Sequence, residues 1–421
     1  IYVTDDNPRN ENPKKIRKTI IKYLNKKNYT EIGNRAKAIK TAVLNAQPFE
    51  IILIAGKGHE TEQDYGNKTI KTSDKLIIKK IKYNKKKINS KQFNFIWNSR
   101  ILKKVLNKNK FFKFRGITIN SKEVKKDNLF IAIKGKNKDG HDYVKEAISK
   151  KVSYCIVSKK LNKFNNKKIL NVKNTNNFLK KIAIAKRLAT GAKLVAVTGS
   201  AGKTTVKTIL GRILNNYADT YFSPKSFNNH YGVPISLSNL ESNHKYGVFE
   251  VGMSKKGEIS TLSNMVKPDI AIITNIAEAH IENFNSLKDI SKAKGEIISN
   301  IKNQGTLIIN RDDKFYHYFN KLAKIKKIKT ISFGRNKKSD IYPIYEKKKK
   351  IFKIKVLDEE ITLNIKNINI YNTLSILAVL KVFNLDLKKS IKYFQLSEQL
   401  AGRGKFHYIF RYKTHFNLID E

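Results

Sequence analysis

Residues 194–210, which read LVAVTGSAGKTTVKTIL, constrain this chain more than any other segment. The apolar, β-branched start is typical of a buried parallel strand, and the end has the apolar spacing of a helix. Backbone N–H groups of the glycine turn between them can surround phosphate oxygens, the lysine can reach terminal phosphates, and a threonine hydroxyl can bind Mg²⁺. The pattern predicts a nucleotide site formed by Gly199, Ser200, Ala201, Gly202, Lys203, Thr204 and Thr205.

Composition restricts the class of protein. With 421 residues and 40% hydrophobic content, the chain is long enough for several globular domains. It contains no run of about 20 apolar residues, so we expect no membrane span. Its start, IYVTDD, resembles an internal segment more than a signal peptide. The single cysteine, Cys155, lies in the apolar run VSYCIV, where we expect a buried strand residue and a reducing, cytoplasmic location.

The formal net charge of +52 raises the question of nucleic acid. The lysines are spread along the whole chain together with abundant Asn and Ile, as an A/T-rich coding sequence would produce. Nucleic-acid modules interleave aromatic and basic side chains on one element, and that pattern is absent from the sequence. We therefore expect solvated surface lysines and no nucleic-acid partner.

Strand and helix patterns alternate through residues 190–410. Strand patterns cover 194–197, 246–252, 269–275, 305–309 and 330–333, and helical patterns begin at 203, 286 and 369. Such alternation predicts an α/β fold with a mostly parallel, doubly wound sheet, flanked here by two smaller α/β domains. Glu250 and His280 follow successive strands, so we expect both at the sheet edge that holds the glycine turn.

The first 80 residues predict a separate small α/β domain. We expect a strand at 1–4, helices at 13–25 and 34–46, and a buried strand at 49–55 that runs into the turn Gly56-Lys57-Gly58-His59-Glu60. Residues 81–93 are rich in Lys and Asn without apolar periodicity and predict a linker.

This first domain resembles the C-terminal domain of the MurE branch of the Mur ligase family, on the segments VTDDNPRNENP, GNRAKAI and LIAGKGHETEQ. MurE ligases add the third residue to the UDP-N-acetylmuramoyl peptide. The resemblance implies that the incoming amino acid, meso-diaminopimelate, is held by Asp6, Asn7, Arg9, Gly56 and Glu60. Arg9 can bind a carboxylate with two parallel hydrogen bonds, and Asp6 and Glu60 can pair with ammonium groups.

Residues 94–189 resemble the N-terminal domain of the MurF branch, which holds the UDP part of the substrate. We expect strands at 116–120, 129–133 and 153–157 and a helix at 142–150. The family's D-S-R is Asn120-Ser121-Lys122 here, and the resemblance implies a substrate contact at Ser121. His141, in the retained Asp-Gly-His, would either fix its loop or contact ligand.

Residues 190–410 resemble the MurF central domain, with GSAGKTT, FNNHYGVP, E-x-G-M, NIAEAH, KAKGEI, N-x-x-N and GRG in family order. The resemblance implies the cofactors ATP and Mg²⁺. Lys203 would contact the ATP phosphates, Thr204 and Glu250 would bind one Mg²⁺, and His280 would help to bind a second. Lys294 matches a lysine that is carbamylated in related ligases and would then supply a carboxylate to metal. The remaining implied roles are the γ-phosphate contact of Arg403, the nucleotide contacts of Asn369 and Asn372, the ATP-ribose contact of Asp420, and orientation of the muramyl peptide by Asn228 and Asn229.

The reaction implied by the resemblance is addition of D-Ala-D-Ala to UDP-N-acetylmuramoyl-tripeptide through an acyl phosphate, with Lys203, His280, Lys294 and Arg403 as catalytic residues. The chain would be a fragment of a MurE–MurF fusion, and residues 411–421 would begin a truncated C-terminal domain. Two alternatives stay open: another ligase of the superfamily, such as a folylpolyglutamate synthase, and a non-catalytic, basic nucleotide- or nucleic-acid-binding protein.

Overall fold

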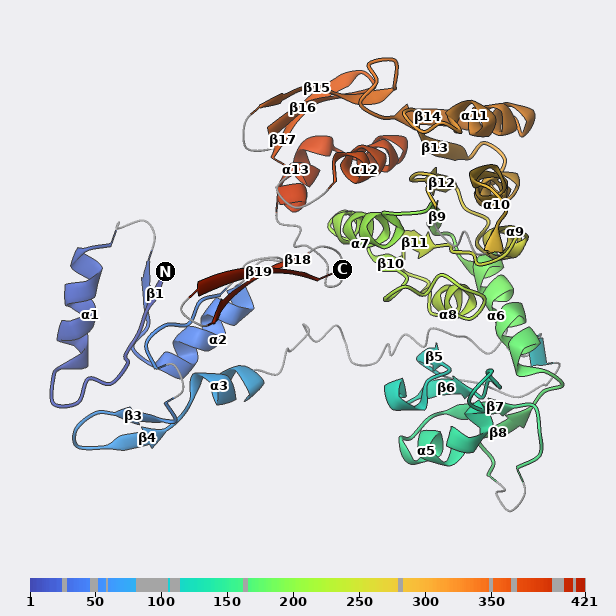
Figure 1. Cartoon of the computed structure of the whole chain (residues 1–421). Helices are drawn as coiled ribbons and strands as arrows, with labels where there is room; N and C mark the ends of the chain where they lie inside the picture. Colours follow the sequence, from blue (N-terminus) through green and yellow to red (C-terminus); the bar gives the residue numbers. More distant parts are fainter. Residues whose placement is uncertain are drawn as a thin grey trace. The chain divides into compact units, whose positions relative to one another are not determined.

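The computed structural model describes residues 1–24, 29–45, 52–57, 60–80, 105–106, 114–161, 166–278, 283–347, 351–364, 369–395, 405–411 and 414–420. These residues form two compact units, Ile1–Phe93 and Asn94–Glu421. Each unit is described by itself below (Figure 1).

A nine-stranded sheet organises the larger unit. Its order is β10-β11-β9-β12-β13-β14-β15-β16-β17; neighbours from β10 to β15 pair in parallel, and β15, β16 and β17 pair antiparallel. The strands are β9 (Lys193–Thr198), β10 (Thr220–Phe222), β11 (Tyr246–Glu250), β12 (Ile270–Ile273), β13 (Thr306–Asn310), β14 (Lys329–Phe333), β15 (Ile341–Lys347), β16 (Ile351–Val356) and β17 (Glu359–Asn364). The predicted, mostly parallel sheet is confirmed. The antiparallel end was not predicted.

Helices cover both faces of this sheet, as expected of a doubly wound fold (Figure 1). Side chains of β9 alternate between the faces: Val195 and Val197 lie in one buried core, and Leu194 and Ala196 in the other. The first core includes α7 (Lys203–Leu214), α12 (Ile370–Val382) and α13 (Leu387–Gln395); the second includes α6 (Thr175–Ala189), α8 (Gly232–Ser238), α9 (Glu258–Val266), α10 (Leu287–Ser299) and α11 (Tyr316–Ile325). Because both faces are buried there, the central parallel strands β9, β12 and β13 are apolar at almost every position, whereas β16 and β17 alternate between buried and more exposed residues.

A second, four-stranded parallel sheet precedes the large one. It consists of β5 (Gly116–Thr118), β6 (Asn128–Ile131), β7 (Tyr154–Val157) and β8 (Ile169–Asn171), in that order, with η1 (Ser121–Glu123), η2 (Gly140–Tyr143) and α5 (Val144–Ser149). The expected strands and helix are confirmed with small shifts; β5 ends early because the Asn120 side chain caps η1. Cys155 is fully buried in β7, as predicted, and burial raises the pKa of its thiol to about 12.

The smaller unit contains short elements. They are β1 (Tyr2–Val3), α1 (Pro13–Lys22), β2 (Thr30–Glu31), α2 (Arg35–Asn45), β3 (Glu62–Asp64), β4 (Thr69–Lys71) and α3 (Asp74–Lys80). The prediction of a buried strand at 49–55 is wrong where it can be compared: residues 52–55 have no regular structure and Leu53 is 87% exposed. Among the described residues of this unit, β1 pairs only with β2, so this apolar run has no partner strand. Residues 46–51 and 81–93 lie outside the described residues.

The chain ends in a two-stranded antiparallel pair, β18 (Lys405–Arg411) and β19 (Thr414–Asp420). Asp420, the expected ribose contact, is the last residue of β19 and faces Lys405 in the register.

One side-chain amide joins the two sheets of the larger unit. Asn239, just after α8, accepts a hydrogen bond from the Ile117 N–H (2.8 Å) and donates one to the Ile117 carbonyl (2.9 Å). The amide therefore pairs with edge strand β5 as a neighbouring strand would. It connects residues 122 positions apart in the chain.

Replacing this amide should loosen the attachment of the small sheet. We expect Asn239→Ala to lower the free energy of unfolding by about 1–3 kcal/mol, because both backbone groups of the buried Ile117 lose their partner. Urea denaturation measures the change. Asn243→Ala is the matched control, since its amide makes an exposed hydrogen bond to Asp219, and equal losses in the two variants would contradict the interpretation.

Candidate active site

The glycine turn after β9 has the backbone of a phosphate-binding loop. Gly199 has φ +144° and Gly202 has φ +81°, both in the region that side chains disfavour. A Cβ on Gly199 would lie 1.9 Å from the Thr274 hydroxyl, and one on Gly202 would lie 2.5 Å from the Asn372 side-chain oxygen. Both positions thus require glycine. Helix α7 starts at Lys203, directly after Gly202, which offers no side chain to cap it.

Two residues that follow β12 hold this loop in place. The Asn275 carbonyl accepts from the Ser200 N–H, and its side-chain oxygen accepts from the Ala201 N–H, both at 2.9 Å. The Thr274 hydroxyl donates to the Ala201 carbonyl at 2.6 Å. The sequence analysis did not select Thr274 or Asn275. Their position directly after a strand adjacent to β9 was the signal that could have found them.

A buried carboxylate lies beside the start of α7. Glu250, at the end of β11, is 1% exposed. One of its oxygens accepts from the Thr204 hydroxyl at 2.9 Å, and the other accepts from the Asn228 side-chain amide at 2.8 Å. The structure therefore brings together Thr204, Glu250 and Asn228, which the sequence analysis selected from three separate segments.

The Thr204–Glu250 pair fits a small, hard cation. Hydroxyl and carboxylate oxygens are ligands that Mg²⁺ accepts, and adjacent ligands of an octahedral Mg²⁺ site lie about 2.9 Å apart. The observed oxygen separation is 2.9 Å. Among the described residues, no group of three or more His, Cys, Asp and Glu side chains is clustered for a metal. Substrate phosphate and water oxygens complete most protein Mg²⁺ sites, so two protein ligands are compatible with one.

Two lysines converge on the Gly199 carbonyl. The Lys203 ammonium donates to it at 2.8 Å and to the Ser200 carbonyl at 3.1 Å, and the Lys294 amine donates to it at 3.0 Å. Lys294, on α10, is 2% exposed. Burial, and secondly the charge of Lys203, lower the pKa of the Lys294 amine to about 7. A large fraction of Lys294 is therefore uncharged near neutral pH.

These groups line a cavity of about 690 Å³ at the carboxyl end of the large sheet. Its walls include Lys203, Lys294, Asn228 and the loop Gly252–Gly257. The loop is fixed from α10 as well, because the Glu296 carboxylate accepts from the Gly257 N–H at 2.8 Å. The cavity is thus rich in cationic groups and suited to an anionic ligand.

The remaining selected residues are placed as follows. Asn369 caps α12 by accepting from the Tyr371 N–H at 2.8 Å, and the Asn372 amide lies against Gly202. Asn229 accepts from the N–H groups of Tyr231 and Gly232, so it holds the start of α8. Thr205 is half-buried in the first turn of α7. His280, Arg403 and the side chain of Asp420 lie outside the described part.

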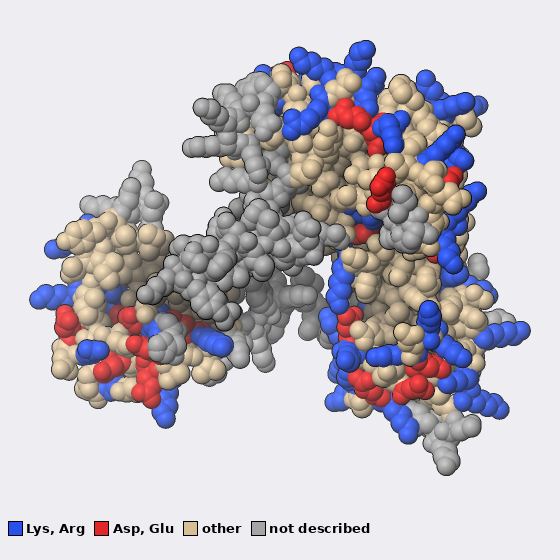
Figure 2. All heavy atoms as spheres, in the orientation of Figure 1, with Lys and Arg blue, Asp and Glu red and all other residues tan. Residues whose placement is uncertain are grey.

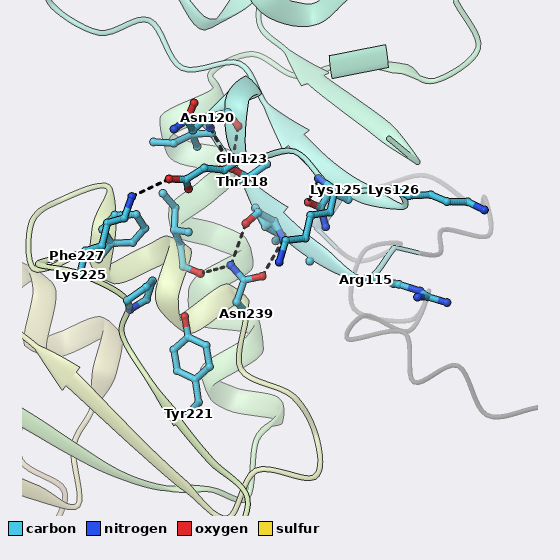
Figure 3. A pocket seen from close by; sticks show the side chains of 16 residues that line it. Arg115, Thr118, Asn120, Glu123, Lys125, Lys126, Tyr221, Lys225, Phe227 and Asn239 are labelled. Carbon is cyan, nitrogen blue, oxygen red and sulfur yellow. Dashed lines mark hydrogen bonds and ion pairs between the residues drawn. The ribbon is translucent and has the colours of Figure 1, made fainter. Parts of the chain in front are cut away.

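A second cavity, of about 850 Å³, lies between the two sheets of the larger unit (Figure 3). Apolar side chains such as Ile117, Tyr221 and Phe227 line it together with Lys125 and Lys225. Figure 3 shows Lys225 and Glu123 pointing toward one another, joined by an ion pair of 2.9 Å. Ser121 is not among the residues that line this cavity; it is buried, and its carbonyl accepts from the Lys150 ammonium.

His141 fixes its own loop. The imidazole Nδ1 lies 2.5 Å from Asp139, and Nε2 accepts from the Ser158 N–H at 2.9 Å. The Ser158 hydroxyl is 3.2 Å from Nε2, but the backbone N–H already occupies the lone pair that a catalytic base would need. Of the two roles left open by the sequence, the structure supports the loop-fixing one.

The smaller unit brings its own selected residues together. Gly56 has φ +111°, and a Cβ there would lie 2.6 Å from an Asp6 oxygen, while the Asn7 amide donates to Glu60 at 2.7 Å. The other Asp6 oxygen is buried and has no hydrogen-bond partner among the described residues. Arg9 is exposed on the same turn. Lys57, which was not selected, has a fully buried side chain whose ammonium lies 3.5 Å from Glu60.

On the face that Figure 2 shows, Lys and Arg are scattered over both units with Asp and Glu among them. None of the helices in the described ranges is long and apolar enough to cross a membrane.

The fold and this site define an α/β protein in which a buried carboxylate lies beside a glycine loop with the backbone of a phosphate-binding loop. Three family models match in chain order: the glutamate ligase domain of Mur ligases over residues 1–58, the catalytic domain of the Mur ligase family over 113–193, and the Mur ligase middle domain over 197–381. A UDP-N-acetylmuramoyl-tripeptide--D-alanyl-D-alanine ligase from Rickettsia prowazekii (strain Madrid E) is 36% identical over 327 residues, which cover 74% of this chain and 71% of that protein. The chain therefore belongs to the Mur ligase family, as its motifs predicted.

Solved structures agree. MurF from Acinetobacter baumannii matches with a TM-score of 0.68 and 26% identity, over 77% of this chain and 72% of that one. MurF from Thermotoga maritima, in complex with ADP, matches with a TM-score of 0.59 and 28% identity, over 69% and 68% of the two chains. The predicted fold class is confirmed, and the described site belongs to a family of ligases.

The buried Lys294 amine should make stability depend on pH. Between about pH 7 and 10.5, Lys294 has lost its proton in the folded chain but keeps it in the unfolded chain. The contribution of Lys294 to the free energy of unfolding therefore increases as the pH rises. The gain is at most about 1.4 kcal/mol per pH unit. Urea denaturation of wild type and Lys294→Met without divalent metal should show the smaller slope in the variant; parallel slopes would show that Lys294 titrates normally.

Proposed function

We propose that residues 94–421 belong to an ATP-dependent ligase that joins D-Ala-D-Ala to UDP-N-acetylmuramoyl-tripeptide. The observation that carries the proposal is the Thr204–Glu250–Asn228 cluster, since it joins the phosphate loop, a cation-binding carboxylate and the FNNHYGVP segment in one place. The relative from Rickettsia prowazekii, 36% identical over 327 residues, is named as a ligase of that specificity.

The chemistry starts from a carboxylate, which is a poor electrophile. Its oxygen attacks the γ-phosphorus of ATP, ADP leaves, and the amine of D-Ala-D-Ala then attacks the acyl phosphate and releases phosphate. When bound, Mg²⁺ supplies charge neutralisation for the phosphoryl group. Lys203 would bind the same phosphates, Thr204 and Glu250 would hold the cation, and Asn228 and Asn229 would orient the peptide. Positioning of this kind supplies most of the rate in phosphoryl transfer.

Lys294 has a chemical reason to be modified. Carbamylation adds CO₂ to an uncharged amine, and a pKa of about 7 makes that form abundant. The product carries a carboxylate and removes the buried positive charge that would lie beside Lys203. His280 and Arg403 complete the proposed catalytic set.

We assign the two cavities to the two ends of the substrate. The 850 Å³ cavity combines apolar walls with a cationic rim, which suits a uracil ring and a diphosphate, and the 690 Å³ cavity lies beside the phosphate loop. Residues 94–189 would then hold the UDP part and residues 190–410 would bind ATP, with Asn369 and Asn372 among the contacts. Asp420, in residues 411–421, would contact the ATP ribose.

The first 80 residues would be the end of a MurE-like ligase that binds meso-diaminopimelate. The glutamate ligase domain model, over 1–58, precedes the catalytic and middle domain models along the chain, as a MurE–MurF fusion joined by a linker at 81–93 would require. Both reactions use cytoplasmic precursors, so we place the protein in the cytoplasm.

Replacing Lys203 tests the proposed ligase. We expect Lys203→Ala to lower ATP-dependent phosphate release by about two to three orders of magnitude, because the transferring phosphates lose a positioned cation. The assay contains the full chain, UDP-N-acetylmuramoyl-tripeptide and D-Ala-D-Ala. Lys193→Ala, an exposed change at the start of β9, is the control. Near-normal turnover of Lys203→Ala would refute the assignment, as would steep, salt-dependent DNA affinity without UDP-substrate binding.

Amino-acid binding tests the meso-diaminopimelate site that we propose in the smaller unit. We expect meso-diaminopimelate to bind the chain and Asp6→Asn to weaken that binding about tenfold, because an ammonium group loses the charge of the carboxylate with the unpartnered oxygen. Isothermal calorimetry measures both affinities. Glu11→Gln, an exposed carboxylate five residues away, should bind normally. Equal affinity for meso-diaminopimelate and L-lysine would show that the second carboxylate is not recognised.

A further inference from the structure

A buried lysine that the mechanism does not use lies one helical turn beyond Lys203. Lys207, on α7, is 2% exposed. Its ammonium donates to the Ser223 carbonyl and to the Lys225 carbonyl, both at 2.7 Å. A buried ammonium is strongly disfavoured unless polar groups replace its water, so these two carbonyls and this cation depend on one another.

The two carbonyls belong to the segment between β10 and α8, residues 223–231. This segment leaves the sheet through an unusual backbone, since Lys225 has φ +46°, a left-handed conformation that residues other than glycine disfavour. The carbonyl groups of Ser223 and Lys225 thus both point toward the Lys207 ammonium. Without the ammonium, the two carbonyl oxygens would face each other around an unfilled buried position and would repel.

The same segment forms a wall of both cavities. Pro224, Lys225 and Phe227 line the larger one, and Asn228 and Asn229 line the one beside the phosphate loop. The Lys225 side chain also reaches the small sheet through its ion pair with Glu123 (Figure 3). A shift of this segment would therefore move contacts along the whole path that a long substrate would occupy. The backbone of the phosphate loop is held by Thr274 and Asn275, and the segment meets the nucleotide side at the Asn228–Glu250 hydrogen bond.

We propose that Lys207 is a positioning residue for the UDP-linked peptide substrate. Its ammonium fixes residues 223–229, so that Phe227 and Asn228, which line the two cavities, can contact the two ends of one substrate together. The proposal rests on the proposed function for the identity of that substrate. It makes α7 the common support of two binding sites, with Lys203 and Thr204 at its start and the substrate segment attached one turn later.

The test compares two buried lysines. Lys207→Met removes the cation and keeps the apolar stem. Lys186→Met is the matched control, because Lys186 is also buried but lies on another helix, α6, where the charge of Glu241 acts on it. Calorimetry gives the affinities for UDP-N-acetylmuramoyl-tripeptide and for a non-hydrolysable ATP analogue. Hydrogen exchange with mass spectrometry follows the peptide that spans 223–229.

We expect Lys207→Met to weaken binding of the UDP-linked peptide about tenfold or more, with the ATP-analogue affinity changed less than about twofold and faster exchange in 223–229. Lys186→Met should change neither affinity, and Lys207→Arg, which keeps a cation, should restore part of the loss. Equal weakening of both ligands by Lys207→Met, or unchanged exchange in 223–229, would overturn the positioning role. If wild type binds ATP but no UDP-linked peptide, the proposed function fails; hydrogen exchange in the variants still decides whether Lys207 fixes the segment.

Discussion

The parallel pairing of β11, β9 and β12 is the constraint on which the site depends. Their register places Glu250 opposite Val197 and Ile273 opposite Thr198, so the three strands end together. A polar residue that follows any of them therefore lies within reach of the phosphate loop. The chain leaves β9 toward β10 and β11 on one side and returns to β12 on the other, and this reversal of strand order opens the crevice in which α/β proteins bind ligands.

Two buried lysines of this fold, Lys294 and Lys207, lie in different surroundings. The Lys294 amine donates to the Gly199 carbonyl and is buried near the Lys203 charge, and its pKa falls to about 7. The Lys207 ammonium lies between two carbonyls at 2.7 Å. The carbonyl partners differ between the two sites, although both lysines are 2% exposed. A chain rich in lysine thus uses a few of them as interior groups with distinct properties.

Sequence reasoning was strongest where function requires a local pattern. Lys203, Thr204 and the glycines could be selected because a strand, a turn and a helix are contiguous in the chain, and Glu250 because strand ends share an edge. Thr274 and Asn275 could have been selected from their position after a strand, but the contacts that they and Lys207 make could not be predicted. These contacts depend on strand pairing and on the backbone path after β10. The apolar run at 49–55 failed for a related reason: an apolar pattern predicts burial only where a partner element is available, and Leu53 has none in the described part.

Glu250 shows why several segments must be placed together for the site to exist. Its two oxygens accept from Thr204 and from Asn228, which lie on the nucleotide helix and on the substrate segment. A carboxylate has acceptors on both sides, whereas a glutamine would offer an acceptor on one side and an N–H group on the other. The N–H group would face either the Thr204 hydroxyl, where we propose that a cation binds, or the Asn228 amide, which donates already. Of these two side chains of similar shape, the carboxylate is therefore the one that can accept hydrogen bonds from Thr204 and from Asn228 at the same time.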